Sequence, residues 1–209
     1  MRRKLKLAGA LEPTQQAARD MIDRQVRHLV RLVDDLLDVS RINQGRLQLR
    51  RERVALAAIL DPILESARPQ FEQAGHRLTA TLPEAPIVLD TDPVRLVQVF
   101  ANLLDNACKF SARGGAIHVS AACAGAQVVV RVADRGIGIA PEDLPRLFEL
   151  FVQAGTPAGQ MPAGLGVGLA LCRGLVALTT TDGLEAIATA VCGRFTLPRR
   201  RSGLSGLRR

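Results

Sequence analysis

The chain has 209 residues, 47% of them apolar, and a formal net charge of +8. This is enough for one full domain with a sizeable core and a smaller appendage. We expect no nucleic-acid partner, because such modules place aromatic side chains among their basic groups, whereas here aromatics make up only 3% and much of the excess charge lies at the two ends. No apolar run reaches membrane-spanning length, so we expect no membrane segment in this chain and a cytoplasmic location, although a longer parent could be membrane-attached.

The first predicted element is a long amphipathic helix over residues 21–40, preceded by a loop that contains Gly9 and Pro13. Its apolar residues are spaced four and three apart, as in a coiled-coil or helix-bundle seam: Ile22, Val26, Leu29, Val33 and Leu36. One long arm cannot bury this seam alone, so we expect a homodimer or association with a related chain.

Gly45 is expected to end this helix, and the alternating residues 47–53 predict a strand. A helix over 54–73 and strands near 76–82 and 86–89 should follow. Asp92 and Pro93 then predict the start of a helix that runs to about residue 110, because Asp is a preferred cap and Pro suits the first helical position.

Two strands, over 116–121 and 126–133, come next. Residues 135–163 are rich in Gly, Pro and Ala, with one short helical piece at 144–151. So long an irregular stretch inside a domain is usually functional, for example a lid. The remaining predicted elements are a helix over 165–178 and strands near 184–190 and 193–197.

Three segments carry candidate chemistry, and the first lies on the helix that Asp92 begins. Asn102 and Asn106 are four residues apart, so both amides project from one face, and Lys109 lies one step further along it. Neutral amide oxygens and one cation suit a hydrated magnesium ion and a phosphate chain. Taken alone, the same residues would fit a solvated helix face.

The second segment is Asp134-Arg135-Gly136-Ile137-Gly138, at the end of a predicted strand. The strand brings one carboxylate to its tip, and Gly136 and Gly138 allow a tight turn and a close approach to a ligand. Such a carboxylate can accept a hydrogen bond from an exocyclic amine such as that of adenine.

The third segment is Gly164-Leu165-Gly166-Val167-Gly168-Leu169, which leads into a helix. Glycines at a helix N-terminus leave backbone N–H groups available to phosphate oxygens, and the helix dipole favours negative charge there. The segment does not match the dinucleotide-binding pattern, because a loop and not a strand precedes it.

In this order the three segments resemble the N, G1 and G2 boxes of the histidine-kinase ATPase family. Residues 148–151 (Phe-Glu-Leu-Phe) look like its F box, and residues 24–43 look like the second helix of the histidine-kinase dimerisation hairpin. The likeness covers about residues 20–178. It implies the C-terminal part of a two-component sensor kinase.

The resemblance implies an α+β fold, a two-layer α/β sandwich with a mixed sheet and helices on one face. It divides the chain into a partial dimerisation hairpin (1–44), an ATP-binding kinase domain (45–198) and a basic tail (199–209). The implied cofactors are ATP and Mg²⁺, and the implied partners are the receiver domain of a response regulator and a second kinase chain.

By similarity, Asp134 would hold the adenine amine, Asn106 would bind magnesium and Lys109 would meet phosphate. Asn102 and the backbone from Gly164 to Leu169 would complete the site, together with Gly136 and Gly138.

The chain departs from the family in two places. None of its three histidines lies in an acceptor motif, so the chain is expected to begin after the acceptor, and His28 falls on the segment that looks like the second helix. Residues 179–183 replace the family's glycine pair, which puts the last strands of the sheet in question.

Three functions therefore remain open: a kinase domain whose acceptor histidine comes from a missing segment or another chain, a non-catalytic ATP-binding or dimerising module, and a gyrase- or chaperone-like ATP hydrolase. The hydrolase is disfavoured because those enzymes place Glu four residues before the magnesium Asn, where this chain has Asn102. A neutral amide is a poor general base.

Overall fold

The computed structural model describes residues 12–124, 127–152, 165–179, 187–189 and 192–198. Several parts of the sequence predictions lie outside the described residues: the basic ends 1–11 and 199–209, the part of the predicted lid from residue 153 onward, and Gly164. The side chains of His28 and of the last two strands are also outside the description.

A five-stranded mixed sheet forms one layer, with strand order β2-β4-β5-β7-β6. Its strands are β2 (Arg77–Thr81), β4 (Ala116–Ala124), β5 (Gln127–Ala133), β6 (Ile187–Thr189) and β7 (Cys192–Pro198). β2 is parallel to β4, and the other neighbours are antiparallel. Residues 179–183 therefore do not prevent closing strands like those predicted, since β7 pairs with β5 along its whole length.

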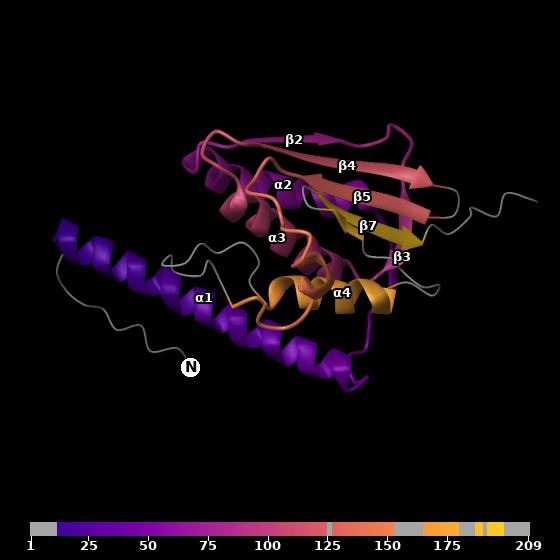
Figure 1. Ribbon diagram of the computed structural model, residues 1–209, viewed down its shortest axis with the longest axis horizontal. Helices are drawn as coiled ribbons and strands as arrows, with labels where there is room; N and C mark the ends of the chain where they lie inside the picture. Colours follow the sequence, from indigo (N-terminus) through magenta and orange to yellow (C-terminus); the bar gives the residue numbers. More distant parts are fainter. Residues whose placement is uncertain (1–11, 125–126, 153–164, 180–186, 190–191, 199–209) are drawn as a thin grey trace, which may run out of the picture.

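Helices α2 (Leu56–Gln73), α3 (Pro93–Phe110) and α4 (Gly168–Thr179) cover one face of this sheet (Figure 1). This arrangement confirms the α+β class, with a mixed sheet and helices on one face. A separate antiparallel pair joins β1 (Glu52–Ala55) to β3 (Val88–Thr91). A single 3₁₀ turn, η1 (Leu144–Arg146), is the only helical structure in the segment where a short helix was predicted.

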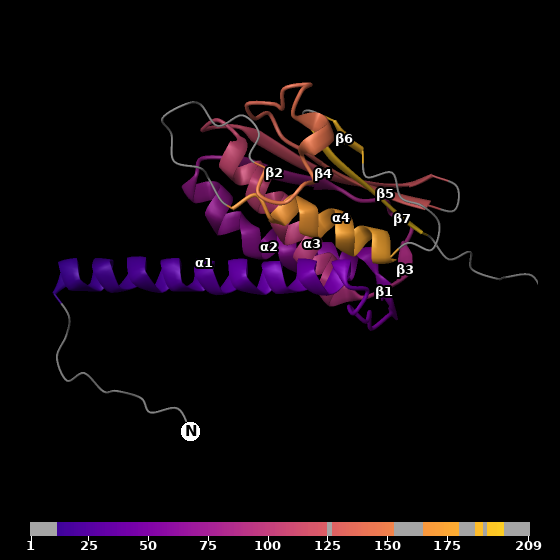
Figure 2. The same cartoon turned by 60° about the horizontal axis from the view of Figure 1, so that its bottom comes forward.

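Helix α1 (Pro13–Asn43) lies across the other helices, and its N-terminal half extends beyond them (Figures 1 and 2). Its C-terminal part packs on α4, so closely that a Cβ at Gly174 would lie 3.1 Å from the Ile42 side chain. None of the described helices is both long and apolar enough to cross a membrane.

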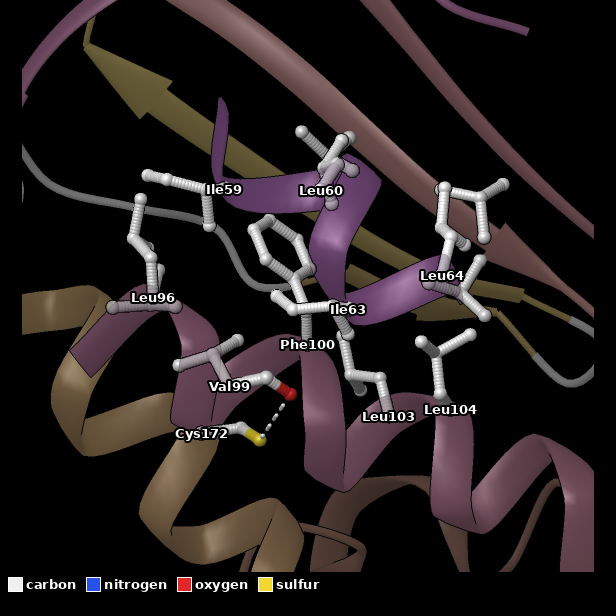
Figure 3. Packing of buried hydrophobic residues seen from close by; sticks show 14 of the residues in the cluster. Ile59, Leu60, Ile63, Leu64, Leu96, Val99, Phe100, Leu103, Leu104 and Cys172 are labelled. Atoms are coloured by element: carbon white, nitrogen blue, oxygen red, sulfur yellow. Dashed lines mark hydrogen bonds between the residues drawn. The ribbon is translucent and has the colours of Figure 1, made fainter. Parts of the chain in front are cut away.

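The core between sheet and helices is aliphatic, as the composition predicts. Apolar side chains from one face of α2 meet those of α3 (Figure 3), namely Ile59, Leu60, Ile63 and Leu64 against Leu96, Val99, Phe100, Leu103 and Leu104. Strands β4 and β5 contribute fully buried residues from the sheet, among them Ile117 and Val130. This packing fixes α3, which carries the first candidate segment, against the sheet.

The loop predicted before residue 21 is wrong from Pro13 onward, because α1 begins there. Proline suits the first position of a helix, where its missing N–H costs nothing. The Gln15 side chain also accepts a hydrogen bond from the Glu12 N–H at 3.2 Å. Pro13, predicted as a loop residue, therefore occupies the first position of α1.

The predicted strand over residues 47–53 is also largely wrong, since β1 begins only at Glu52. The backbone N–H of Arg50 donates to the side chain of Asp92 at 2.9 Å and not to a neighbouring strand. The Arg51 side chain reaches the carbonyl oxygen of Leu178 at 2.9 Å. This segment is held by side-chain contacts to two helix ends.

Candidate nucleotide-binding site

Helix α3 begins where Asp92 and Pro93 predict it. The Asp92 Oδ1 accepts hydrogen bonds from the backbone N–H groups of Val94 and Arg95 at 3.1 and 3.2 Å. These are donors that the first turn of a helix cannot satisfy by itself. The cap fixes where α3 starts and therefore which of its faces carries Asn102, Asn106 and Lys109.

The first and third segments meet where α3 packs on α4. A Cβ at Gly168 would lie 3.5 Å from the Oδ1 of Asn102, which is ordinary van der Waals contact. Asn102 and Asn106 are both partly exposed. The predicted face of α3 thus adjoins the N-terminus of α4, where backbone N–H groups are free to meet an anion.

The second segment is attached to the C-terminus of α3. The Ile137 N–H donates to the carbonyl oxygen of Phe110 at 3.1 Å, and Ser111 forms a bridge with Gly136. A Cβ at Gly136 would lie 2.4 Å from the Phe110 oxygen, so only glycine fits there. The loop after β5 and the end of α3 therefore form one packed unit.

Asp134 lies at the tip of β5, as predicted, and its carboxylate is partly buried. Its Oδ1 accepts a hydrogen bond from the Gly136 N–H at 2.8 Å. Burial raises the pKa of the Asp134 carboxyl, and the Gly136 hydrogen bond only partly opposes this. A half-buried carboxylate with one oxygen bonded can still accept a hydrogen bond on the other. Gly138 follows in a left-handed conformation, with φ 72°.

The third segment differs from its prediction in one respect: α4 begins at Gly168 and not near residue 165. Gly166 has φ 67°, which is not helical, and its carbonyl oxygen accepts the Phe151 N–H at 3.0 Å. A Cβ on Gly166 would lie 2.5 Å from the Val152 oxygen. The glycine thus joins the end of the F-box-like segment to the start of α4.

Three hydrophobic residues alternate with these glycines, and two of them contribute to packing. Val167 is buried, and Leu169 packs against the core. Leu165 is 43% exposed. Leu165 is therefore the most exposed of the three.

Lys109 has a partner that the sequence predictions did not assign. Its Nζ lies 2.5 Å from the Oδ2 of Asp105, one helical turn back. The other oxygen of Asp105 accepts from the Gln70 side chain of α2 at 3.4 Å. An acidic residue four positions before a lysine is a recognised helix pair, so the spacing alone could have revealed this contact.

The donors near α3 match what a magnesium–phosphate group needs. Among the described residues, no three or more His, Cys, Asp or Glu side chains gather to hold a metal ion. Mg²⁺ keeps several waters and takes few protein ligands beside substrate phosphates, so one amide oxygen such as that of Asn106 fits. No hydrogen bond or ion pair joins Asn106 to Asp134 in the described part of the chain.

Comparisons with known proteins show the family to which this chain belongs. Residues 91–199 match the family described as histidine kinase-, DNA gyrase B-, and HSP90-like ATPase. The Non-motile and phage-resistance protein of Caulobacter vibrioides is 38% identical over 184 residues, which cover 84% of this chain and 22% of that protein. Histidine protein kinase DivJ of the same organism is 35% identical over 173 residues, 83% of this chain and 29% of DivJ.

Full-length ShkA in complex with AMPPNP superposes with a TM-score of 0.70 at 26% identity, over 91% of this chain and 40% of ShkA. The chain spans less than a third of the length of the two curated relatives. It belongs to the histidine kinase-, DNA gyrase B- and HSP90-like ATPase family, and it carries the ATP-binding domain of the sensor histidine kinases.

Proposed function

We propose that this chain is the ATP-binding catalytic part of a two-component sensor kinase. It transfers the γ-phosphoryl group of ATP to a histidine that a segment outside this sequence or another chain supplies. The partners are the receiver domain of a response regulator and a second kinase chain, and the site of action is cytoplasmic. Residues 1–44 form part of the dimerisation hairpin, 45–198 the kinase domain and 199–209 a basic tail.

Each residue of the site has one role in this proposal. Asp134 accepts a hydrogen bond from the adenine amine, and the backbone of Gly136 and Gly138 lets the base approach. Asn106 binds the magnesium ion, assisted by Asn102, and Lys109 meets the phosphates. The backbone from Gly164 to Leu169 cradles the phosphate chain. Bound Mg²⁺ supplies neutralisation of the phosphate charge.

One observation carries the proposal: both glycine segments converge on α3. Gly168 adjoins Asn102 on one side of the helix, and Gly136 is locked to Phe110 at its C-terminus. Two segments that are separate from α3 in the sequence thus pack against the helix that carries Asn106 and Lys109, which supports the proposal. Phosphoryl transfer requires mainly such positioning and charge neutralisation.

The histidines of this chain support an acceptor elsewhere. The Nε2 of buried His76 donates to the carbonyl oxygen of Cys108 at 3.1 Å, and the Nδ1 of His118 lies 2.9 Å from the Thr79 hydroxyl on the sheet. His28 lies on α1 and is followed by Leu-Val-Arg, without the acidic neighbour of an acceptor motif.

The same lack of an acceptor motif favours a second candidate, a non-catalytic ATP-binding module that pairs with intact kinases. A hydrolase fits less well. Asn102 stands where the hydrolases have Glu, and its amide abuts Gly168, so it cannot activate water as a general base.

Calorimetry with Mg·ATP tests the site. The wild-type chain should bind in the micromolar-to-millimolar range usual for enzyme substrates. Asp134→Ala leaves the adenine amine unpaired, so it should weaken binding by about 1–3 kcal/mol. Wild-type affinity in this variant would remove Asp134 from the site, and an absence of binding to the wild-type chain would overturn the proposal.

Labelled ATP distinguishes the two candidates. The chain alone should form no acid-labile phosphate. A separate hairpin fragment that carries an acceptor histidine should become labelled if this is a kinase domain, and should stay unlabelled if the module only binds ATP. Phosphohistidine on the chain alone, abolished by His28→Gln, would make His28 the acceptor.

A further inference from the structure

Lys109 is the lysine of the proposed site, and it is already engaged by Asp105. The ammonium and the carboxylate are 2.5 Å apart, and both side chains are less than one-third exposed, at 30% and 28%. The other Asp105 oxygen accepts a hydrogen bond from Gln70 of α2, so the Asp105 side chain lies on the side of α3 that faces α2. Asn102, one turn before Asp105 on α3, faces α4 instead, and the proposed phosphate site lies there.

The helix geometry allows the Lys109 side chain two alternative orientations. Residues three and four apart on a helix are neighbours, so Lys109 is one turn beyond both Asp105 and Asn106. A lysine side chain is long and flexible, and its ammonium is a compact point charge. The same stem can therefore direct Nζ either to the Asp105 carboxylate or toward the Asn106 face.

We propose that Asp105 is a positioning residue that holds Lys109 away from the phosphate site until nucleotide binds. The inference rests on the proposed function. Nucleotide phosphates compete with the Asp105 carboxylate for Nζ, and Lys109 changes partner when they bind. Asp105 thus lowers affinity for any phosphate chain and makes the most highly charged nucleotide the best competitor.

The first test is calorimetry with Mg·ATP on Asp105→Asn. This isosteric change removes the competing charge and keeps an oxygen for Gln70. Affinity should rise about two- to fivefold, the range expected for loss of a partly exposed ion pair, and the gain should shrink at high salt. Asp61→Asn removes an equal charge from an exposed carboxylate in the second turn of α2, does not alter the partner of Lys109, and should leave affinity unchanged.

A double-mutant cycle separates this role from a structural one. In a Lys109→Met background, Asp105→Asn should change affinity by less than about 1.5-fold, because the ammonium for which Asp105 and the phosphates compete is gone. An equal gain in affinity in both backgrounds would show that Asp105 acts by its charge alone and not through Lys109. Weaker binding in Asp105→Asn would show that Asp105 assists nucleotide binding. Either result overturns the proposal. If wild-type chain binds no nucleotide, the proposed function has failed before this question arises.

Lysine NMR observes the partner change directly. The sequence has only three lysines, Lys4, Lys6 and Lys109, so reductive ¹³C-methylation gives few signals, and Lys109→Arg assigns the one of interest. That signal should move in nucleotide-free Asp105→Asn, and should move again in wild type when Mg·ATP is added. If Asp105→Asn does not change the chemical shift of the Lys109 signal, the ammonium is not held by Asp105 in the nucleotide-free protein, and the proposal is wrong.

Discussion

Two glycines of one motif have opposite requirements at the residue scale. Gly166 has φ 67° and its Cβ would strike the Val152 oxygen at 2.5 Å, whereas a Cβ at Gly168 meets Asn102 only at 3.5 Å. Gly166→Ala should therefore lower the free energy of unfolding by about 1–3 kcal/mol. Gly168→Ala should leave it unchanged or raise it slightly, because Ala is the better helix former.

Urea denaturation of both variants checks this pair, with wild type as reference. Equal stability of the two alanine variants would mean that Gly166 does not adopt the left-handed conformation on which the join between Phe151 and α4 depends.

Asp35 provides a pH-dependent prediction at the same scale. Burial against α3 raises the pKa of its carboxyl, and the hydrogen bond from Gln98 only partly opposes this. The folded protein thus binds this proton more tightly than the unfolded chain does, so stability falls as pH rises from the unfolded pKa through the folded one. Above that window the cost is constant.

Asp35→Asn keeps an oxygen for Gln98 and removes the ionisation. Its Tm should therefore exceed that of wild type at neutral pH, and the difference should shrink as pH is lowered through the window. Scanning calorimetry from mildly acidic to neutral pH measures this. Asp61→Asn removes an exposed carboxylate of α2 that is not among the charges acting on Asp35, so it is the control and should leave the Tm of wild type unchanged.

At the element scale, helix α1 is fastened to α3 by a buried polar network. Arg95 donates to Asp38 at 2.6 Å and to Gln98 at 2.9 Å, and the Gln98 amide donates to Asp35 and Asp38, both at 3.1 Å. Asp35 and Asp38 are buried. The network joins the predicted dimerisation helix to α3, which carries the first segment of the proposed nucleotide site.

Arg95→Met leaves the buried Asp38 carboxylate without its closest ion-pair partner, and should lower the free energy of unfolding by about 2 kcal/mol. This loss is smaller than that for a fully buried ion pair, because the Arg95 side chain is 21% exposed. Arg27→Met breaks an exposed pair one turn apart, Arg27–Asp23, and should change stability by less than about 0.5 kcal/mol. Chemical denaturation compares the two. Equal losses would mean that the network does not hold α1 in place.

Sequence reasoning succeeded at this scale where a local signal decides the structure. Asp92 and Pro93 fixed the start of α3 because a cap and a first-position proline act within one turn. It failed where the partner is distant. The strand expected over 47–53 is replaced by a segment that a hydrogen bond between Arg50 and Asp92 holds in place.

The candidate site follows the same division. The motif order predicted which segments meet, and the contacts of Gly136 with Phe110 and of Gly168 with Asn102 agree with it. The ion pair of Lys109 with Asp105 was not predicted, because the motif assigned the lysine to phosphate and left Asp105 without a role.

At the scale of the whole molecule, α1 extends beyond the other helices (Figure 2), and most of its predicted seam is exposed to solvent. Ile22, Val26, Leu29 and Val33 are each more than half exposed, at 64, 51, 59 and 55%, while Leu36 packs against the core. A contiguous apolar stripe of this kind marks an interaction surface, so we predict a dimer through α1.

Light scattering on the intact chain should give the mass of a dimer. Replacing Ile22, Val26 and Leu29 with Ser should give a monomer with unchanged nucleotide affinity, because all three side chains are exposed and none belongs to the proposed site. Val94→Ser, which removes another exposed valine (69%) on α3, should remain dimeric. A wild-type monomer at high concentration would contradict the assignment of the seam.

The central claim is that ATP binds where three segments converge on α3, and amide NMR with Mg·ATP tests it most directly. The account predicts that the perturbed backbone signals cluster in residues 102–109, 134–138 and 166–169. Signals of the β1–β3 pair, which precedes the opposite, N-terminal end of α3, should not move. Perturbations centred on the cleft beside Gly75, which Arg68 and Arg77 line, or none at all, would contradict the account.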